Sequence, residues 1–129
     1  TRLGDRTELT SLAVTYGAGA PGGGPLLGSV KSNVGHTQAA AGALGLAKVL
    51  LAARHGAVPA TLHVDDRSSE IDWEKTALRL AAKSTAWPAR DGTRIGAVSA
   101  FGMSGTNTHV VVEVPDTGGE GARGQGRAA

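Results

Sequence analysis

The sequence predicts an α/β fold, and two of its features carry that prediction. A short apolar segment, 26–32, leads through a polar turn into a long Ala- and Leu-rich helix that ends near residue 55. Two later segments, 95–100 and 108–114, are rich in small and β-branched residues, and a short glycine-containing loop joins them as in an antiparallel pair. The length of 129 residues is enough for one domain.

Composition restricts the classes of function. Lys and Arg total 13 against 11 Asp and Glu, and this scattered surplus does not favour nucleic-acid binding. The absence of Cys excludes disulfides, thiolate zinc sites and a cysteine nucleophile supplied by this chain. The longest apolar stretch, 39–53, is interrupted by Lys48 and is too short to cross a membrane. With no signal peptide visible either, we expect a cytoplasmic protein without membrane contact.

The first segment, 1–16, has apolar residues at helical spacing, and we expect a helix that Asp5 or Thr7 caps and Gly17 ends. The following residues, 17–22, match the G-x-G-x-x-G pattern of dinucleotide sites. That motif requires a strand before it and a helix after it, whereas a helix precedes it here. A surface loop is therefore the stronger interpretation.

The middle of the chain predicts a strand–turn–helix unit. Segment 26–32 is a buried strand and 33–36 a tight polar turn, after which Thr37 caps a helix that runs to His55. The run 39–43 leaves the first helical turns almost without side chains, so another backbone can approach them closely.

The second half of the chain predicts mainly strands. Residues 60–72 are polar and irregular, and 78–81 reads as an edge strand. The segments 95–100 and 108–114 form the antiparallel pair described above. From residue 115 the sequence is Gly- and Arg-rich and cannot pack a core, so 115–129 is predicted to be a disordered tail or linker.

His36 is the strongest catalytic candidate, because the predicted turn places it at the start of the long helix. A helix N-terminus disfavours an imidazolium and leaves a neutral ring with one N–H to donate. Such a donor can polarise a carbonyl and stabilise an enolate. Lys31 can pair with a buried carboxylate or fix His36 indirectly. The alternative is that His36 only caps the helix and Lys31 is a solvated strand end.

The loop 101–107 is the second candidate. Its glycines allow main-chain N–H groups to face a cavity, as in an oxyanion hole, and Phe101 could close that cavity. The alternative is an ordinary hairpin loop whose Phe fills the core. His55, His63 and His109 match no common metal-ligand spacing, so no metal site is predicted, and His109 reads as a structural histidine on a strand.

Three segments together resemble one family. Residues 1–5 (TRLGD), 30–42 (VKSNVGHTQAAAG) and 99–110 (SAFGMSGTNTHV) are similar to the β-ketoacyl synthase domains of modular type I polyketide synthases. Segments 54–56 and 59–63 lie at matching intervals between them.

The resemblance covers residues 1–114 and implies the C-terminal half of a ketosynthase domain. The implied fold is thiolase-like, a layered αβαβα arrangement with a mixed sheet and a central buried helix. The implied reaction is a decarboxylative Claisen condensation between acyl and malonyl-type thioesters, in antibiotic biosynthesis. The substrates arrive on the phosphopantetheine of acyl carrier protein, and this chain binds no cofactor itself. The implied partners are an N-terminal half with the Cys nucleophile, the carrier protein and a second copy in a homodimer.

The resemblance also assigns residues. His36 matches one of the two family histidines that assist decarboxylation, and Lys31 matches the lysine that orders the charged network beside them. Phe101 matches the gating phenylalanine, and Phe101 and Gly102 form the oxyanion and gating loop. In the same motifs, we expect substrate-binding residues at Asn33, Thr37 and Asn107.

Some positions depart from the family pattern. Thr1 matches the last Thr of a His-Gly-Thr-Gly-Thr motif, which implies that the other histidine and the cysteine precede this chain. Arg6 and Thr7 stand where Pro and Ile are usual, and Thr108 stands where Ala is usual. The alternative function is therefore a non-catalytic ketosynthase-like fragment that acts as a scaffold or docking piece.

Overall fold

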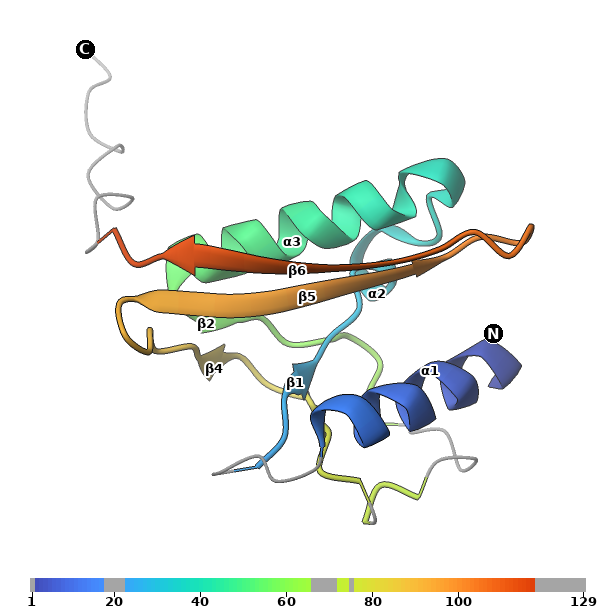
Figure 1. Ribbon diagram of the computed structural model, residues 1–129, viewed down its shortest axis with the longest axis horizontal. Coiled ribbons are helices and arrows are strands. Elements are labelled where there is room, and N and C mark those ends of the chain that lie inside the picture. The colour runs from blue at the N-terminus through green and yellow to red at the C-terminus, as the bar shows by residue number, and fades with distance from the viewer. Residues whose placement is uncertain (1, 18–22, 66–71, 75, 118–129) are drawn as a thin grey trace.

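The computed structural model describes residues 2–17, 23–65, 72–74 and 76–117 (Figure 1). Its elements, in chain order, are α1 (Arg2–Tyr16), β1 (Leu26–Leu27), α2 (Lys31–Val34), the 3₁₀ helix η1 (Gln38–Ala40), α3 (Ala41–His55), β2 (Ala57–Val58), β3 (Arg79–Leu80), β4 (Thr85–Ala86), β5 (Thr93–Phe101) and β6 (Asn107–Pro115). The α/β class predicted from the sequence is confirmed. Most of the G-x-G-x-x-G loop and the tail beyond residue 117 lie outside the described residues.

The β5–β6 hairpin is the longest strand pair that the structure describes. Its strands pair antiparallel over nine positions, from Thr93 opposite Pro115 to Phe101 opposite Asn107. This confirms the predicted pair, and the β-branched residues of β6 explain its length. Because side chains alternate across a strand, residues of even number on β5 share one face of the hairpin and those of odd number share the other.

The even-numbered face packs against α3, which runs beside the hairpin in Figure 1. A Cβ added at Gly45 would lie 2.9 Å from Val98 Cγ1, and one added at Gly96 would lie 2.7 Å from Val49 Cγ1. Contacts this short require a hydrogen in place of a methyl group. The close approach predicted for the small residues of this helix is therefore confirmed, and it extends from Gly42 to Gly45.

The opposite, odd-numbered face contacts α1 through His109. The hydroxyl of Tyr16 lies 2.7 Å from His109 Nε2, and the hydroxyl of Ser99 lies 2.8 Å from His109 Nδ1. Tyr16 is at the C-terminal end of α1, and Ser99 and His109 are paired across the hairpin. Both ring nitrogens of His109 thus have partners, which confirms its interpretation as a structural histidine.

Two smaller sheets lie beside the hairpin. Strands β1 and β3 pair in parallel, and β2 and β4 pair antiparallel, with two residues in each strand. The described residues therefore contain both parallel and antiparallel pairs, but these form three separate two-stranded sheets. The apolar core of the described residues is small and consists of Ala52, Ala53, Leu78 and Ala81.

Several predicted boundaries are wrong. The helix α1 begins at Arg2, so Asp5 and Thr7 lie inside it and do not cap it. The strand predicted over 26–32 ends at Leu27, because residues from Lys31 onward form the short helix α2. β2 and β4 were not predicted, since two-residue strands leave no periodic pattern.

Two further corrections concern the long helix and the tail. Thr37 forms no side-chain cap, and α3 begins at Ala41 after η1. The boundary predicted at residue 115 is wrong, because β6 includes Pro115 and Asp116 is anchored. The amide of Asp116 donates to Gly92 O at 2.8 Å, and its carboxylate lies 3.1 Å from Arg94 Nη1. At its other end, α3 stops at the predicted Gly56, whose φ is +63°.

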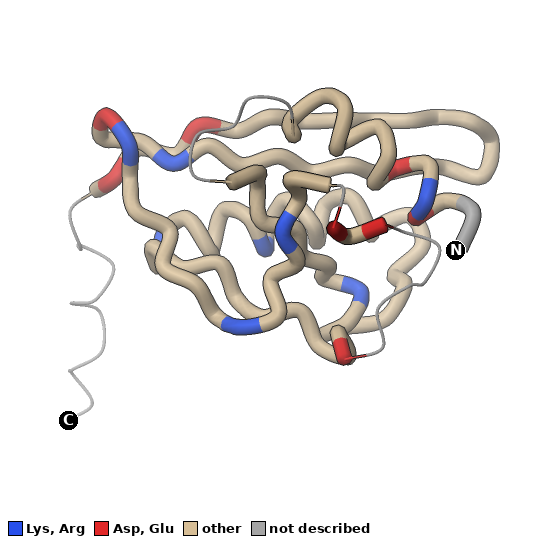
Figure 2. The backbone as a smooth tube through the Cα atoms, turned by 90° about the horizontal axis from the view of Figure 1, so that it is seen from below, with Lys and Arg blue, Asp and Glu red and all other residues tan. Residues whose placement is uncertain are grey.

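The outer surface of α3 remains open in this chain. Leu50 and Leu51 are 41% and 54% exposed, although both are large apolar side chains of the helix. The charged residues are interspersed along the backbone (Figure 2). Among the described helices, none is both long and apolar enough to cross a membrane.

Candidate active site

His36 lies in the linker between α2 and η1, and the backbone around it is sharply bent. Gly35 has a φ of +73°, and Gln38 has a φ of +52°, which is unusual for a residue with a side chain. This bend directs the N–H of Gln38 at His36 Nδ1, with 3.1 Å between the two nitrogens. The side chain of His36 is exposed in this chain.

The bond from Gln38 determines the tautomer of a neutral His36. Because the backbone N–H donates to Nδ1, that nitrogen carries no proton, and the ring proton is at Nε2. The sequence predicted a neutral donor through the dipole of a long helix. The long helix α3 begins at Ala41, five residues after His36, and η1 runs directly into it. The N–H of Gln38, the first residue of η1, defines the donor.

Lys31 and Asn33 both lie on α2, and both are exposed. Lys31 is the first residue of this helix and not the end of a strand. Asn33 Oδ1 accepts a hydrogen bond of 3.0 Å from Lys48 Nζ, which comes from α3. Asn33, predicted to bind substrate, therefore has an internal partner that the sequence did not reveal.

Glu8 of α1 is the carboxylate that faces this region. Burial raises its pKa, while the positive charge of Lys31 acts in the opposite direction. Asp5 raises this pKa further, and His109 lowers it. Lys31 thus acts electrostatically on a half-buried carboxylate, and a direct pairing of the two stays a prediction. The sequence named no partner, because only the fold brings α1 beside α2.

The predicted gating loop joins β5 to β6 and is fully on the surface. Phe101 is 58% exposed, so the alternative in which it fills the core is wrong. The amide of Gly102 donates to Thr106 O at 2.8 Å, so this N–H is used within the loop. Gly102 therefore offers no free donor to an oxyanion in this conformation. Asn107 is exposed and pairs with Phe101.

The His36 linker and this loop converge on the same end of α3. Gly42, in the first turn of α3, would bring an added Cβ to 3.3 Å from Ala100 Cβ, the residue before Phe101. His36 precedes the same turn by way of η1. Thr37 is half-buried, and its backbone carbonyl oxygen accepts a hydrogen bond from the N–H of Ala40, which helps to form η1. The two sequence motifs therefore meet around the small residues that begin α3.

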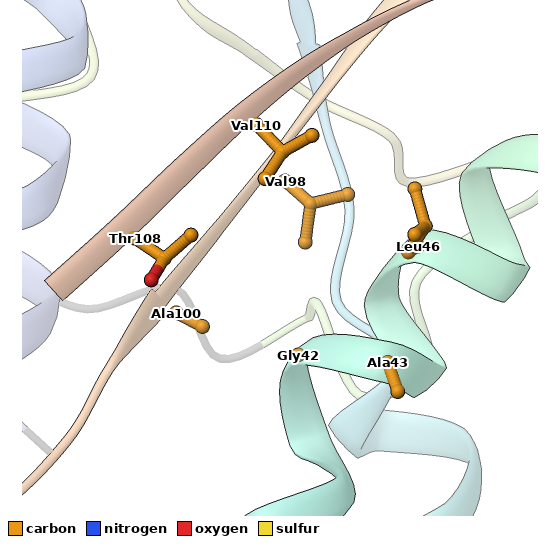
Figure 3. A pocket seen from close by; sticks show the side chains of 7 residues that line it. All are labelled: Gly42, Ala43, Leu46, Val98, Ala100, Thr108 and Val110. Carbon is orange, nitrogen blue, oxygen red and sulfur yellow. The ribbon is translucent and has the colours of Figure 1, made fainter.

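An apolar cavity of about 230 Å³ lies between the hairpin and α3 (Figure 3). Its wall consists of Gly42, Ala43, Leu46, Val98, Ala100, Thr108 and Val110. The side chains of Val98, Ala100, Thr108 and Val110 project from the hairpin toward the helix. Thr108 is the one polar side chain in this wall.

Comparison with known proteins identifies the family. Residues 1–65 match the family model described as "Beta-ketoacyl synthase, C-terminal domain". The chain belongs to the β-ketoacyl synthase family. It is 56% identical over 114 residues to the polyketide synthase GfsA of Streptomyces halstedii and 52% identical over 114 residues to the erythronolide synthase EryA3 of Saccharopolyspora erythraea. The resemblance to polyketide ketosynthases is therefore confirmed.

Solved structures confirm the fold of this ketosynthase segment. The ketosynthase from module 6 of the bacillaene synthase from Bacillus subtilis 168 matches with a TM-score of 0.80 and 38% identity over 88% of the chain. The ketosynthase from module 1 of the bacillaene synthase from Bacillus amyloliquefaciens FZB42 matches with a TM-score of 0.80 and 30% sequence identity. The fold is thus thiolase-like.

The chain spans only part of each of these proteins. It covers 2% of GfsA, 4% of EryA3 and 21% of either bacillaene ketosynthase. The activity, the substrates and the partners of a complete ketosynthase therefore enter only as proposals.

Proposed function

We propose that this chain supplies the decarboxylation histidine of a polyketide ketosynthase. The reaction is a decarboxylative Claisen condensation between two thioesters. A malonyl-type thioester loses carbon dioxide, and the electron pair of the broken C–C bond forms an enolate. The enolate carbon then attacks an acyl thioester on a cysteine, whose thiolate leaves. This chain has no Cys, so a further ketosynthase segment must provide that nucleophile.

The tautomer of His36 carries the proposal. Negative charge develops on the thioester oxygen during decarboxylation, and a positioned N–H donor stabilises that charge as it forms. The bond from Gln38 N–H to His36 Nδ1 leaves Nε2–H as the donor. The exposed side of the ring is the side from which a thioester would approach.

Lys31 and Phe101 have separate proposed roles beside His36. Lys31, within reach of the Glu8 carboxylate, orders the charge around the histidine and does not contact the reacting atoms. Phe101 is exposed at the end of β5 and gates the approach of the acyl chain. With the Gly102 amide engaged in the loop, any oxyanion donor from this loop would be a different main-chain N–H.

The proposed substrates are bound as thioesters to the phosphopantetheine arm of acyl carrier protein. The proposed partners are the cysteine-bearing part of the ketosynthase, the carrier protein and a second copy of the complete domain. Family membership and the similarity to polyketide synthases support each of these partners. Leu50 and Leu51, exposed on α3, are consistent with a surface that the rest of the domain covers.

The test is to combine this chain with the cysteine-bearing part of a ketosynthase and to measure carbon dioxide release from a malonyl carrier. His36→Ala should reduce the rate by roughly 10²- to 10⁴-fold, the range of a positioned donor or acid–base group. His55→Ala is the matched control, since His55 is exposed at the far end of α3. An unchanged rate in His36→Ala would reject the role of His36.

A further inference from the structure

Lys48 occupies an unusual place for a lysine that no motif of the active site includes. Its ammonium group reaches from the middle of α3 toward α2 and donates to two oxygens, Ser29 O at 3.0 Å and Asn33 Oδ1 at 3.0 Å. Burial lowers the pKa of Lys48, so the fold places this charge at some cost in free energy. Two charge-assisted hydrogen bonds compensate for that cost.

Together with the chain itself, these two bonds form a closed loop of contacts that contains the linker with His36. The C-terminal end of the linker continues through η1 into α3 and is therefore attached to this helix covalently. The N-terminal end is α2, and Lys48 ties it to α3 through Asn33, fifteen positions earlier in the chain. His36 lies within this closed loop of contacts, between Gly35, whose φ is +73°, and the strained Gln38.

Other bonds hold the start of this segment to a different part of the molecule. Ser29 N donates to Thr61 Oγ1, and Leu62 N donates to Ser32 Oγ, each at 3.2 Å. They fix 29–32 to the loop at 61–62. The polar link to α3 comes from Lys48.

We propose that Lys48 is a positioning residue for His36, which holds α2 against α3 so that the bend at 35–38 keeps Nε2–H directed at the substrate. This role rests on the proposed decarboxylation function. Lys48 acts through Asn33 and the backbone, so its loss should reduce the rate of the chemical step and leave substrate affinity unchanged. The role also reassigns Asn33 from substrate binding to support of the His36 linker.

The experiment compares Lys48→Met, Lys48→Arg and the control Lys83→Met in the reconstituted ketosynthase. Lys83 is exposed, so its replacement removes one positive charge without touching the linker. We expect Lys48→Met to lower kcat for decarboxylation roughly ten- to hundredfold, with KM for the malonyl carrier unchanged within about twofold. Lys48→Arg keeps the charge and the donors and should recover most of the rate.

A second measurement does not depend on activity. The amide of Gly35 donates to Lys31 O at 2.9 Å and closes α2, whereas the amide of Gly56 closes α3. Lys48→Met should accelerate hydrogen exchange at Gly35 roughly tenfold and leave Gly56 unchanged. In Asn33→Ala, Lys48→Met should have a smaller effect on kcat, since one of the two Lys48 bonds, the one to α2 itself, is already lost.

Three results would overturn the role of Lys48. They are a wild-type kcat in Lys48→Met, a fall in kcat that Lys83→Met reproduces, and a fall in kcat with unchanged exchange at Gly35. If His36→Ala decarboxylates as fast as the parent, the proposed function is wrong. Even then, the exchange at Gly35 decides whether Lys48 holds the linker.

Discussion

The α3–β5 interface and the His36 linker are stabilised in opposite ways. Between α3 and β5, glycines remove side chains so that Val98 and Val49 can touch backbone, and the contact is apolar beside the cavity that Gly42 and Leu46 line. In the linker, single hydrogen bonds hold an exposed and sharply bent backbone, with a lysine from α3 as the anchor. Short apolar contacts resist movement because the atoms on either side have little room to rearrange, whereas isolated polar bonds exchange readily with water.

This difference indicates which region determines the stability of the chain and which determines its proposed activity. The packed interface fixes α3 and the hairpin as a rigid unit, and the catalytic candidates lie at its edge. The linker can present His36 to a substrate because it is not buried within that unit. Substitutions in the interface should therefore change stability first, and substitutions in the linker should change activity first.

The largest effect on stability is expected at Gly96. In Gly96→Val, the new Cβ would lie 2.7 Å from Val49 Cγ1 and 3.0 Å from Trp87 Cη2, so the neighbouring side chains must shift. Overpacking of this kind costs about 1–3 kcal/mol in the free energy of unfolding. Ala97→Val is the control, because Ala97 is exposed on the opposite face of β5. Equal losses in both variants, measured by denaturant unfolding, would refute a tightly packed α3–β5 interface.

A smaller effect is expected at Tyr16. Tyr16→Phe removes the hydroxyl 2.7 Å from His109 Nε2 and keeps the ring contact between the two side chains. A hydrogen bond contributes about 0.5–1.5 kcal/mol to the free energy of unfolding. Because this bond is exposed, we expect Tyr16→Phe to lower that free energy by an amount near the lower end of the range. Thr10→Val, on an exposed part of the same helix, serves as the control. If the unfolding free energy does not change beyond that control, α1 is not held through His109.

The smallest effect is expected in the pH dependence of stability that Glu8 causes. Its folded-state pKa is raised by burial, so the folded chain binds this proton more tightly than the unfolded chain. The Glu8 contribution to stability is therefore present below its ordinary pKa of 4.5 and is lost as the pH rises through the raised value. Glu8→Gln should flatten this decline and leave the chain more stable than the parent at neutral pH. Thermal unfolding of both at several pH values measures the difference, and a steeper decline in the variant would contradict it.

The sequence was sufficient for elements with a clear periodic pattern. Long helices and the β-branched hairpin extend over enough residues for their period to be visible, and Gly56 ended α3 as predicted. Two-residue strands and the four-residue helix α2 have too few residues for any period, so the strand predicted over 26–32 was wrong. The residues around 31–36 follow local turn geometry, which depends on distant partners such as Lys48.

The same limit applies to the site. His36, Lys31 and Phe101 could be selected because they stand in motifs, and the resemblance extended over most of the chain. Glu8 and Lys48 stand in no motif, and only the fold brings α1 and α3 beside α2. The donor was expected from the helix end, and the structure specifies which group there is responsible, the backbone amide of Gln38 at the start of η1.

The most direct test of the central claim is the ¹⁵N chemical shifts of the His36 imidazole, recorded at a pH where the ring is neutral. The account predicts a protonated Nε2 and an unprotonated Nδ1, because Gln38 N–H donates to Nδ1. His55 provides an internal comparison in the same spectrum, and it should show the mixed shifts of an exposed ring. A proton found on Nδ1 of His36 would contradict the account, because the nitrogen left for the thioester oxygen would then be an acceptor.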